Sequence, residues 1–128
     1  MNIGLSASAV FSQTDRPAEL FRPDVDHIEV GMFEDRDIAD QFVRDSRIRG
    51  KTVGIHSPLV RGGSKYDLLG QVDVPIEDAW LQIENELAWC RSAGTSYLLV
   101  HFPFVMATGT LDLTRVTDDL GRLSRLQA

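Results

Sequence analysis

The sequence is poor in cysteine, in basic residues and in long apolar runs. Its single cysteine, Cys90, excludes an internal disulfide and any zinc site built from several cysteines, and its place in a helical apolar pattern predicts a buried thiol. Thirteen basic residues against nineteen acidic ones give a formal net charge of -6, which disfavours nucleic acid and anionic membranes as partners. No apolar run approaches the roughly 20 residues of a membrane span. The first residues also lack the features of a signal peptide, so we expect a cytoplasmic protein without a membrane segment.

What the chain does contain is typical of a globular protein, with 43% hydrophobic and 25% charged residues. We predict one domain over 1–128. Strand-like and helix-like patterns alternate, with strands expected at 2–8, 26–32, 52–56 and 96–101 and helices at 16–21, 34–50, 73–94 and 113–123. Because parallel strands need crossover connections, four strand–helix units in series predict an α/β fold with a parallel sheet.

Two closures of such a sheet compete: an open doubly wound sheet, or the first half of a (β/α)8 TIM barrel. No Gly-x-Gly-x-x-Gly motif follows the first strand and no P-loop occurs, which weakens the nucleotide-binding alternative. A complete barrel needs about 250 residues. We therefore expect a half-barrel or truncated barrel with unpaired strand edges, completed in a homo-oligomer or by a second half-barrel.

The helix predicted over 73–94 has the most regular apolar spacing in the chain. Its apolar positions are Ile76, Trp80, Ile83, Leu87 and Cys90. We expect Trp80 to pack in the core and Trp89, which lies off this stripe, to anchor at the surface.

Polar side chains end two of the predicted strands in the same way. His56 and His101 each close an apolar run and are each followed by a proline within two positions. With Glu29 they share the inward parity of their strands, so in a barrel they would meet at the C-terminal mouth. For each histidine the alternative is a hydrogen bond to strand-end backbone, and for Glu29 structural and functional interpretations stay open. His27, at the opposite end of its strand, is predicted to be structural.

The order of four short segments carries a resemblance to a known family. These segments are Ile3-Gly4-Leu5-Ser6, His27-Ile28-Glu29-Val30, Gly54-Ile55-His56-Ser57-Pro58 and Leu99-Val100-His101-Phe102-Pro103. In them the sequence resembles the xylose isomerase-like TIM barrel superfamily, which contains sugar-phosphate isomerases and epimerases and the endonuclease IV family. The whole chain can be laid, in order, along the first half of such a barrel.

The resemblance implies a divalent metal at the mouth, with His101 as a metal ligand, His56 as a catalytic histidine beside the substrate or metal, and Glu29 as a catalytic carboxylate facing the substrate. The family's strongest metal carboxylates and its acid/base residues lie on strands five to eight. Activity would therefore need the missing half of the barrel or a partner chain.

Two imidazoles and a carboxylate could ligate Mn²⁺, Zn²⁺ or Mg²⁺. Such a metal would stabilise the enediolate that forms when a proton is removed from carbon. The predicted function is a sugar or sugar-phosphate isomerase or epimerase that uses metal-assisted proton transfer. Two alternatives stay open: a metal-dependent phosphodiesterase of the endonuclease IV type, which the acidic balance disfavours, and a non-catalytic half-barrel assembly module.

Four further residues are predicted to bind the substrate. Ser6 belongs to the inward set of the first strand. Arg61 and Lys65 flank a glycine pair whose backbone amides could hold a phosphate, although such a loop is also typical of a solvated lid. Phe102 could wall a sugar pocket, with plain packing as the alternative.

Overall fold

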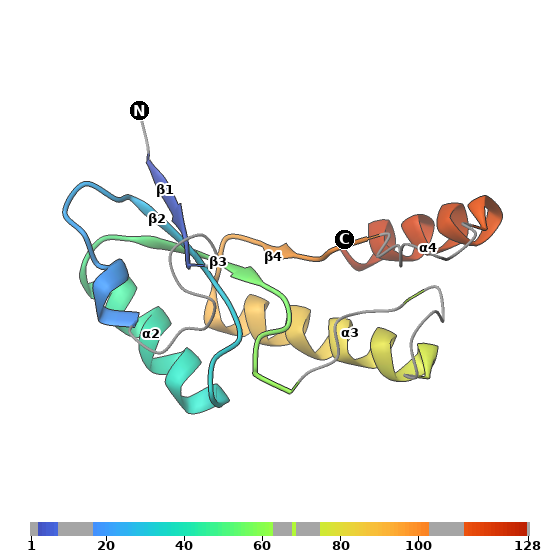
Figure 1. Ribbon diagram of the computed structural model, residues 1–128, viewed down its shortest axis with the longest axis horizontal. Coiled ribbons are helices and arrows are strands. Elements are labelled where there is room, and N and C mark those ends of the chain that lie inside the picture. The colour runs from blue at the N-terminus through green and yellow to red at the C-terminus, as the bar shows by residue number, and fades with distance from the viewer. Residues whose placement is uncertain (1–2, 8–16, 63–67, 69–74, 103–111, 128) are drawn as a thin grey trace.

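A computed structural model describes residues 3–7, 17–62, 68, 75–102 and 112–127 of the protein. The elements, in chain order, are β1 (Gly4–Ser6), the 3-10 helix η1 (Pro17–Leu20), β2 (His27–Val30), α2 (Arg36–Ile48), β3 (Thr52–His56), α3 (Ile76–Ala93), β4 (Leu98–Leu99) and α4 (Leu113–Leu126). The four strands form one parallel sheet in the order β1-β2-β3-β4 (Figure 1). The predicted α/β class, with strands and helices alternating along a parallel sheet, is confirmed.

The outer strands are shorter than the sequence pattern predicts. β1 has three residues and β4 has two, where the patterns run over 2–8 and 96–101. Within the part of the chain that the structure describes, each outer strand pairs with a neighbour on one side only. β4 is held by hydrogen bonds from Ile55 N to Tyr97 O (2.9 Å) and from Ser57 N to Leu99 O (3.0 Å). His101 therefore lies two residues beyond β4 and is not its last residue.

Local capping explains where the long helices begin and end. The Asp35 carboxylate accepts a hydrogen bond from Ile38 N (2.9 Å) at the start of α2, and Asp112 caps α4 in the same way. α3 ends at Gly94, whose φ of 63° is the left-handed conformation that glycine adopts without a Cβ clash. No helix in the described ranges is both long enough and apolar enough to cross a membrane.

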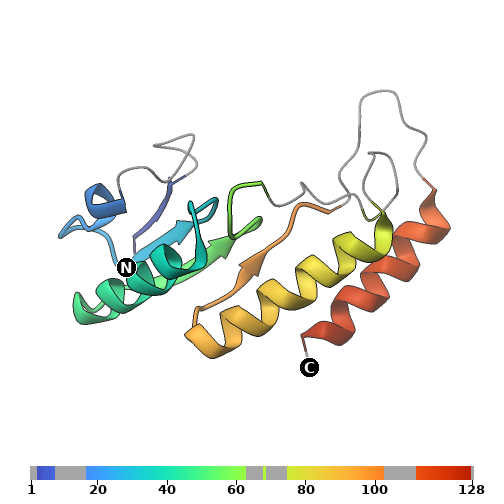
Figure 2. The same cartoon turned by 90° about the horizontal axis from the view of Figure 1, so that it is seen from below.

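α2 and α3 lie on the same face of the sheet (Figures 1 and 2). The apolar residues of β2 and β3 pack against α2 and the end of α3 in one buried cluster, which includes Ile28, Val30, Val53, Ile55, Phe42, Val43 and Cys90. A second cluster joins α3 to α4 through Trp80, Ile83, Leu123 and Leu126. Because strand side chains alternate, the apolar set of each strand faces the helices and the polar set points to the opposite face.

α3 is covered over a wider stripe than its sequence spacing indicates. Trp89 is only 8% exposed and its Nε1 donates to Asp40 Oδ1 on α2 (2.9 Å), so the predicted surface position is wrong. Cys90 is buried as predicted. The Glu86 carboxylate is also buried, where it accepts from Leu59 N (2.9 Å) and from the Ser57 hydroxyl. Contacts with α2 and with the segment after β3 thus bury positions that an amphipathic pattern leaves outside.

Candidate functional site

The polar face of the sheet carries one row of residues that runs across β1, β2 and β3 to Tyr97, the residue just before β4. The strand register pairs Ser6 with Glu29 and Glu29 with Gly54. One position before the Ile55–Leu98 pair, Tyr97 comes beside Gly54. Four segments distant in sequence therefore meet in one line, around Glu29.

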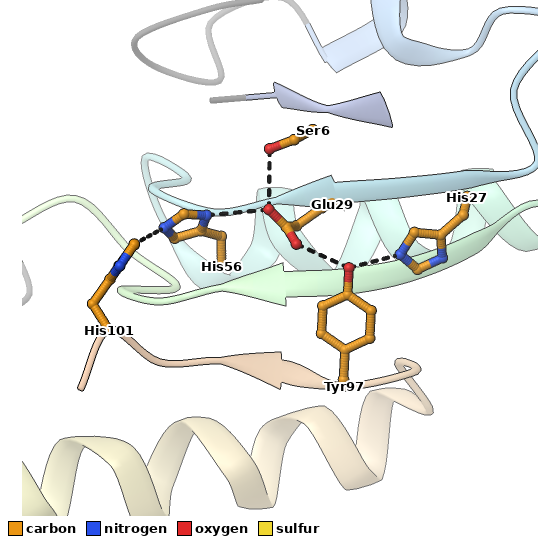
Figure 3. Close-up of polar contacts among 6 residues, drawn as sticks. All are labelled: Ser6, His27, Glu29, His56, Tyr97 and His101. Carbon is orange, nitrogen blue, oxygen red and sulfur yellow. Dashed lines mark hydrogen bonds and ion pairs between the residues drawn. The ribbon is translucent and has the colours of Figure 1, made fainter. Parts of the chain in front are cut away.

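Gly54 is the position in this row that lacks a side chain, and the space is taken by the ring of Tyr97. A Cβ on Gly54 would lie 2.3 Å from a carbon of that ring, a distance that real Cβ atoms do not show. The ring can therefore lie over β3, and its hydroxyl reaches Glu29 Oε2 on β2 (2.9 Å; Figure 3).

The Glu29 carboxylate accepts hydrogen bonds at both oxygens. Oε1 accepts from Ser6 Oγ (3.0 Å) and from His56 Nδ1 (3.3 Å), and Oε2 accepts from Tyr97. Burial alone raises the pKa of the Glu29 carboxyl, but the hydrogen bonds from Tyr97, Ser6 and His56 together bring that pKa below its ordinary value. Glu29 is thus ionised at neutral pH and acts only as an acceptor.

The two histidines predicted to share a site do meet. His56 Nε2 lies 2.7 Å from His101 Nε2, with the ring centroids 4.8 Å apart (Figure 3). Because Glu29 can only accept, His56 Nδ1 carries the proton that faces it, and Nε2 of neutral His56 carries a lone pair. His101 Nε2 then donates to His56 in this structure. The half-buried His56 is held by Glu29, whereas His101 is exposed and is the outer member of the pair.

Hydrogen bonds extend from Glu29 in two directions. The first arm is the His56–His101 pair, and a second arm runs through Tyr97 toward the opposite end of the strands. His27 Nε2 lies 3.0 Å from the Tyr97 hydroxyl, and His27 Nδ1 lies 2.8 Å from Thr52 Oγ1. Burial and the hydrogen bond to Glu29 raise the pKa of Tyr97 to about 12, so this hydroxyl keeps its proton at neutral pH. The polar face therefore holds a continuous chain of side-chain hydrogen bonds from His101 to Thr52.

The backbone at the end of β3 is held in place from two sides. A Cβ on Gly31 would lie 1.8 Å from the His56 carbonyl oxygen, so the chain after β2 packs directly on the backbone of His56. On the helix side, Glu86 binds Ser57 and Leu59, the residues on either side of Pro58. His56 is therefore attached to a rigid strand end.

Of the residues predicted for the site, the structure brings together Ser6, Glu29, His56 and His101. Arg61 lies in the segment after β3, where its Nε donates to Met32 O (3.0 Å). Phe102 packs against the cluster that contains Trp80. Lys65 lies outside the described residues. No contact tests the predicted roles of these three residues in substrate binding.

Sequence reasoning missed Tyr97 and gave His27 a purely structural role away from the site. The structure connects both to Glu29 through two hydrogen bonds. A signal was available, because Tyr97 has the same strand parity as His101 and faces a glycine in the neighbouring strand. Recognising it required the register between β3 and β4.

A divalent metal can be tested against the donor set of this face. Within the described ranges, no three His, Cys, Asp or Glu side chains gather into a group that could hold a metal ion. His56 and His101 nevertheless direct two imidazole nitrogens at each other, and Glu29 binds the other ring nitrogen of His56. A carboxylate behind a ligating histidine is the usual outer support of a metal site. The residues fit two ligands and one supporting carboxylate, and a third ligand would have to come from elsewhere.

Comparisons with family models, with curated proteins and with solved structures find no match for this chain. The resemblance to the xylose isomerase-like superfamily therefore stays a prediction. The geometry of the polar face is the physical basis on which a function can be proposed.

Proposed function

We propose that this chain supplies half of the metal site of a sugar or sugar-phosphate isomerase or epimerase with a xylose isomerase-like barrel. The observation that carries the proposal is the His56–His101 pair, with Nε2 atoms 2.7 Å apart, one at the end of β3 and one two residues beyond β4, and with Glu29 behind His56. The two nitrogens meet in a hydrogen bond, so a metal that takes both would replace this bond. The carboxylate behind His56 is the arrangement usual for a ligating histidine, and it supports a shared ligand.

His56 Nε2 and His101 Nε2 would hold the metal once the proton of His101 lies on Nδ1, which frees the second lone pair. Imidazole suits Zn²⁺ better than Mn²⁺ or Mg²⁺. When bound, the metal would act as a Lewis acid on a hydroxyl or carbonyl oxygen of the substrate. Glu29 keeps the proton of His56 on Nδ1, which leaves the lone pair on Nε2. Because three hydrogen-bond donors already occupy its two oxygens, Glu29 is placed better to position His56 than to remove a substrate proton itself.

The acid/base group that moves the substrate proton, and the third metal ligand, would come from a second half-barrel. A closed barrel of this kind needs eight strands, whereas the described sheet has four. A second copy of the chain would complete the ring if the outer edge of β4 in each copy paired with the outer edge of β1 in the other. The cytoplasmic location expected from the sequence is part of the same proposal.

Metal binding is the first test, and the three histidines of the chain provide a matched control. We expect purified protein to bind Zn²⁺ or Mn²⁺ stoichiometrically in isothermal titration calorimetry. His101→Ala should lose affinity by about 100-fold or more, above the 10–100-fold typical of outer-shell changes. His27→Ala removes a histidine from the same face but not from the pair, and should lose far less. Absence of stoichiometric binding, or equal losses in the two variants, would refute the metal site.

The reaction class is tested on the metal-loaded protein in deuterated water. A panel of aldoses, ketoses and their phosphates should include one that acquires deuterium at the carbon next to the carbonyl, as seen by NMR. Native mass spectrometry of the same sample tests assembly. We expect two copies, with association favoured by salt because each chain has a net charge of -6. If the protein is purely monomeric and no substrate acquires deuterium, the proposed isomerase or epimerase activity is refuted.

A further inference from the structure

The polar face contains a tyrosine hydroxyl that the proposed metal ligands do not require. Tyr97 is 41% exposed, yet its hydroxyl lies between Glu29 Oε2 (2.9 Å) and His27 Nε2 (3.0 Å) and not in open water. We propose that Tyr97, seated over Gly54, is a positioning residue that fixes the Glu29 carboxylate and through it the ring of His56. The metal-binding consequence of this inference rests on the proposed function.

Rotation of the Glu29 carboxylate is the freedom that Tyr97 removes. The terminal torsion of a glutamate is broad and roughly two-fold, so contacts at one oxygen leave the group free to turn. Ser6 and His56 both contact Oε1. Tyr97 contacts Oε2 and is the partner that holds the other oxygen. With both oxygens held, Oε1 stays directed at His56 Nδ1.

The direction of each hydrogen bond also follows from Glu29. Tyr97 has one hydroxyl proton, and because Glu29 only accepts, that proton goes to Oε2. The Tyr97 oxygen then accepts from His27 Nε2, and His27 Nδ1 lies 2.8 Å from the hydroxyl of Thr52. His101 and His56 donate toward Glu29 from the other side. Both arms therefore converge on one acceptor, and each donor orients the next.

Gly54 gives this device its matched test, because the glycine and the tyrosine can be changed separately. Tyr97→Phe keeps the ring and deletes the hydroxyl. Gly54→Ala keeps the hydroxyl but places a Cβ where the ring lies. Thr117→Val, on α4, deletes a hydroxyl that, within the described residues, donates to Leu113 O of its own helix, and it serves as the control.

The first readout is the tautomer of His56 in metal-free protein, measured by long-range ¹H–¹⁵N NMR at neutral pH. We expect His56 with its proton on Nδ1 in the unchanged protein and in Thr117→Val. Tyr97→Phe and Gly54→Ala should both shift the population toward the Nε2–H form, because a carboxylate that turns no longer selects Nδ1. If Tyr97 only stabilised the fold, its replacement by Phe would leave the ratio of the two His56 tautomers unchanged.

The second readout is Zn²⁺ affinity of the same four proteins. Loss of an outer-shell group costs about 10–100-fold, and Tyr97 acts one contact further out, so we expect a loss of up to about 10-fold in both variants. If none of the four proteins binds Zn²⁺ but the His56 tautomer still shifts in Tyr97→Phe and Gly54→Ala, the proposed function fails and the positioning role stands. If Tyr97→Phe folds and leaves His56 unchanged, the positioning role is refuted, whatever Gly54→Ala does.

Discussion

The two faces of the sheet use the same strands for opposite purposes. On β3, Val53 and Ile55 are buried against the helices, while Thr52, Gly54 and His56 belong to the polar face. Apolar burial is non-directional and scales with area, so the helix face tolerates small shifts. The polar face depends on hydrogen bonds whose distances and directions are fixed. Neighbouring residues should therefore differ sharply in what their loss costs.

The largest effect that sharpens this comparison is expected at Ile55. Ile55→Ala removes a fully buried side chain and should lower the free energy of unfolding by about 2–5 kcal/mol. His56→Ala, one residue on, should cost about 1.5 kcal/mol, the lower end of the range for a hydrogen bond to a charged group, and should abolish the proposed metal binding. Urea unfolding of both variants measures the difference. Equal losses of stability at the two positions would mean that the faces are not separate in function.

Glu86 is an exception to the division between the faces, because its charged carboxylate is buried on the apolar, helix-covered side. Glu86→Ala leaves Leu59 N without its acceptor, and we expect a loss of about 1–3 kcal/mol in the free energy of unfolding. Glu84→Ala is the control on the same helix. Its ion pair with Arg122 is partly exposed and should contribute less than about 1 kcal/mol. A loss at Glu84 as large as that at Glu86 would contradict the structural role of the buried carboxylate.

The sequence predicts which residues belong to each face of the sheet better than it predicts the contacts between them. Strand parity placed Glu29, His56 and Ser6 on one face and the apolar residues on the other, because alternation is local and needs no partner. It also brought His56 and His101 together, because the carboxyl ends of parallel strands meet. The class of fold followed from the order of the elements. These are properties of short segments.

What sequence reasoning missed depends on contacts between segments. Tyr97 reaches Glu29 only because Gly54 lies between them in the register of β3 and β4. Trp89 and Glu86 are buried by α2 and by the segment after β3, which no helical periodicity can indicate. Long-range packing sets these features, and one sequence contains no direct record of it.

The acid limb of the stability curve tests the polar face directly. The folded pKa of Glu29 is depressed, so its contribution to stability is present above the unfolded pKa and is lost as pH falls through the folded pKa. Glu29→Gln should be less stable than the unchanged protein at neutral pH, and the gap should close at acid pH. Urea unfolding of metal-free protein from neutral to acid pH measures it. Parallel curves for the two proteins would contradict an ionised Glu29 held by three donors.

The smallest expected effect lies at the alkaline end and belongs to Tyr97. Its folded pKa of about 12 lies above the ordinary value, so the stabilisation is present below the ordinary pKa of tyrosine, about 10, and is lost as pH rises through 12. The difference in ultraviolet absorbance between the unchanged protein and Tyr97→Phe isolates this ionisation from that of Tyr66. Gly54→Ala, which displaces the ring from Glu29, should return the pKa of Tyr97 toward 10. A Tyr97 that ionises at its ordinary value in the unchanged protein would mean that the hydroxyl is not held by Glu29. The polar face would then end at Glu29, with no second arm to orient it.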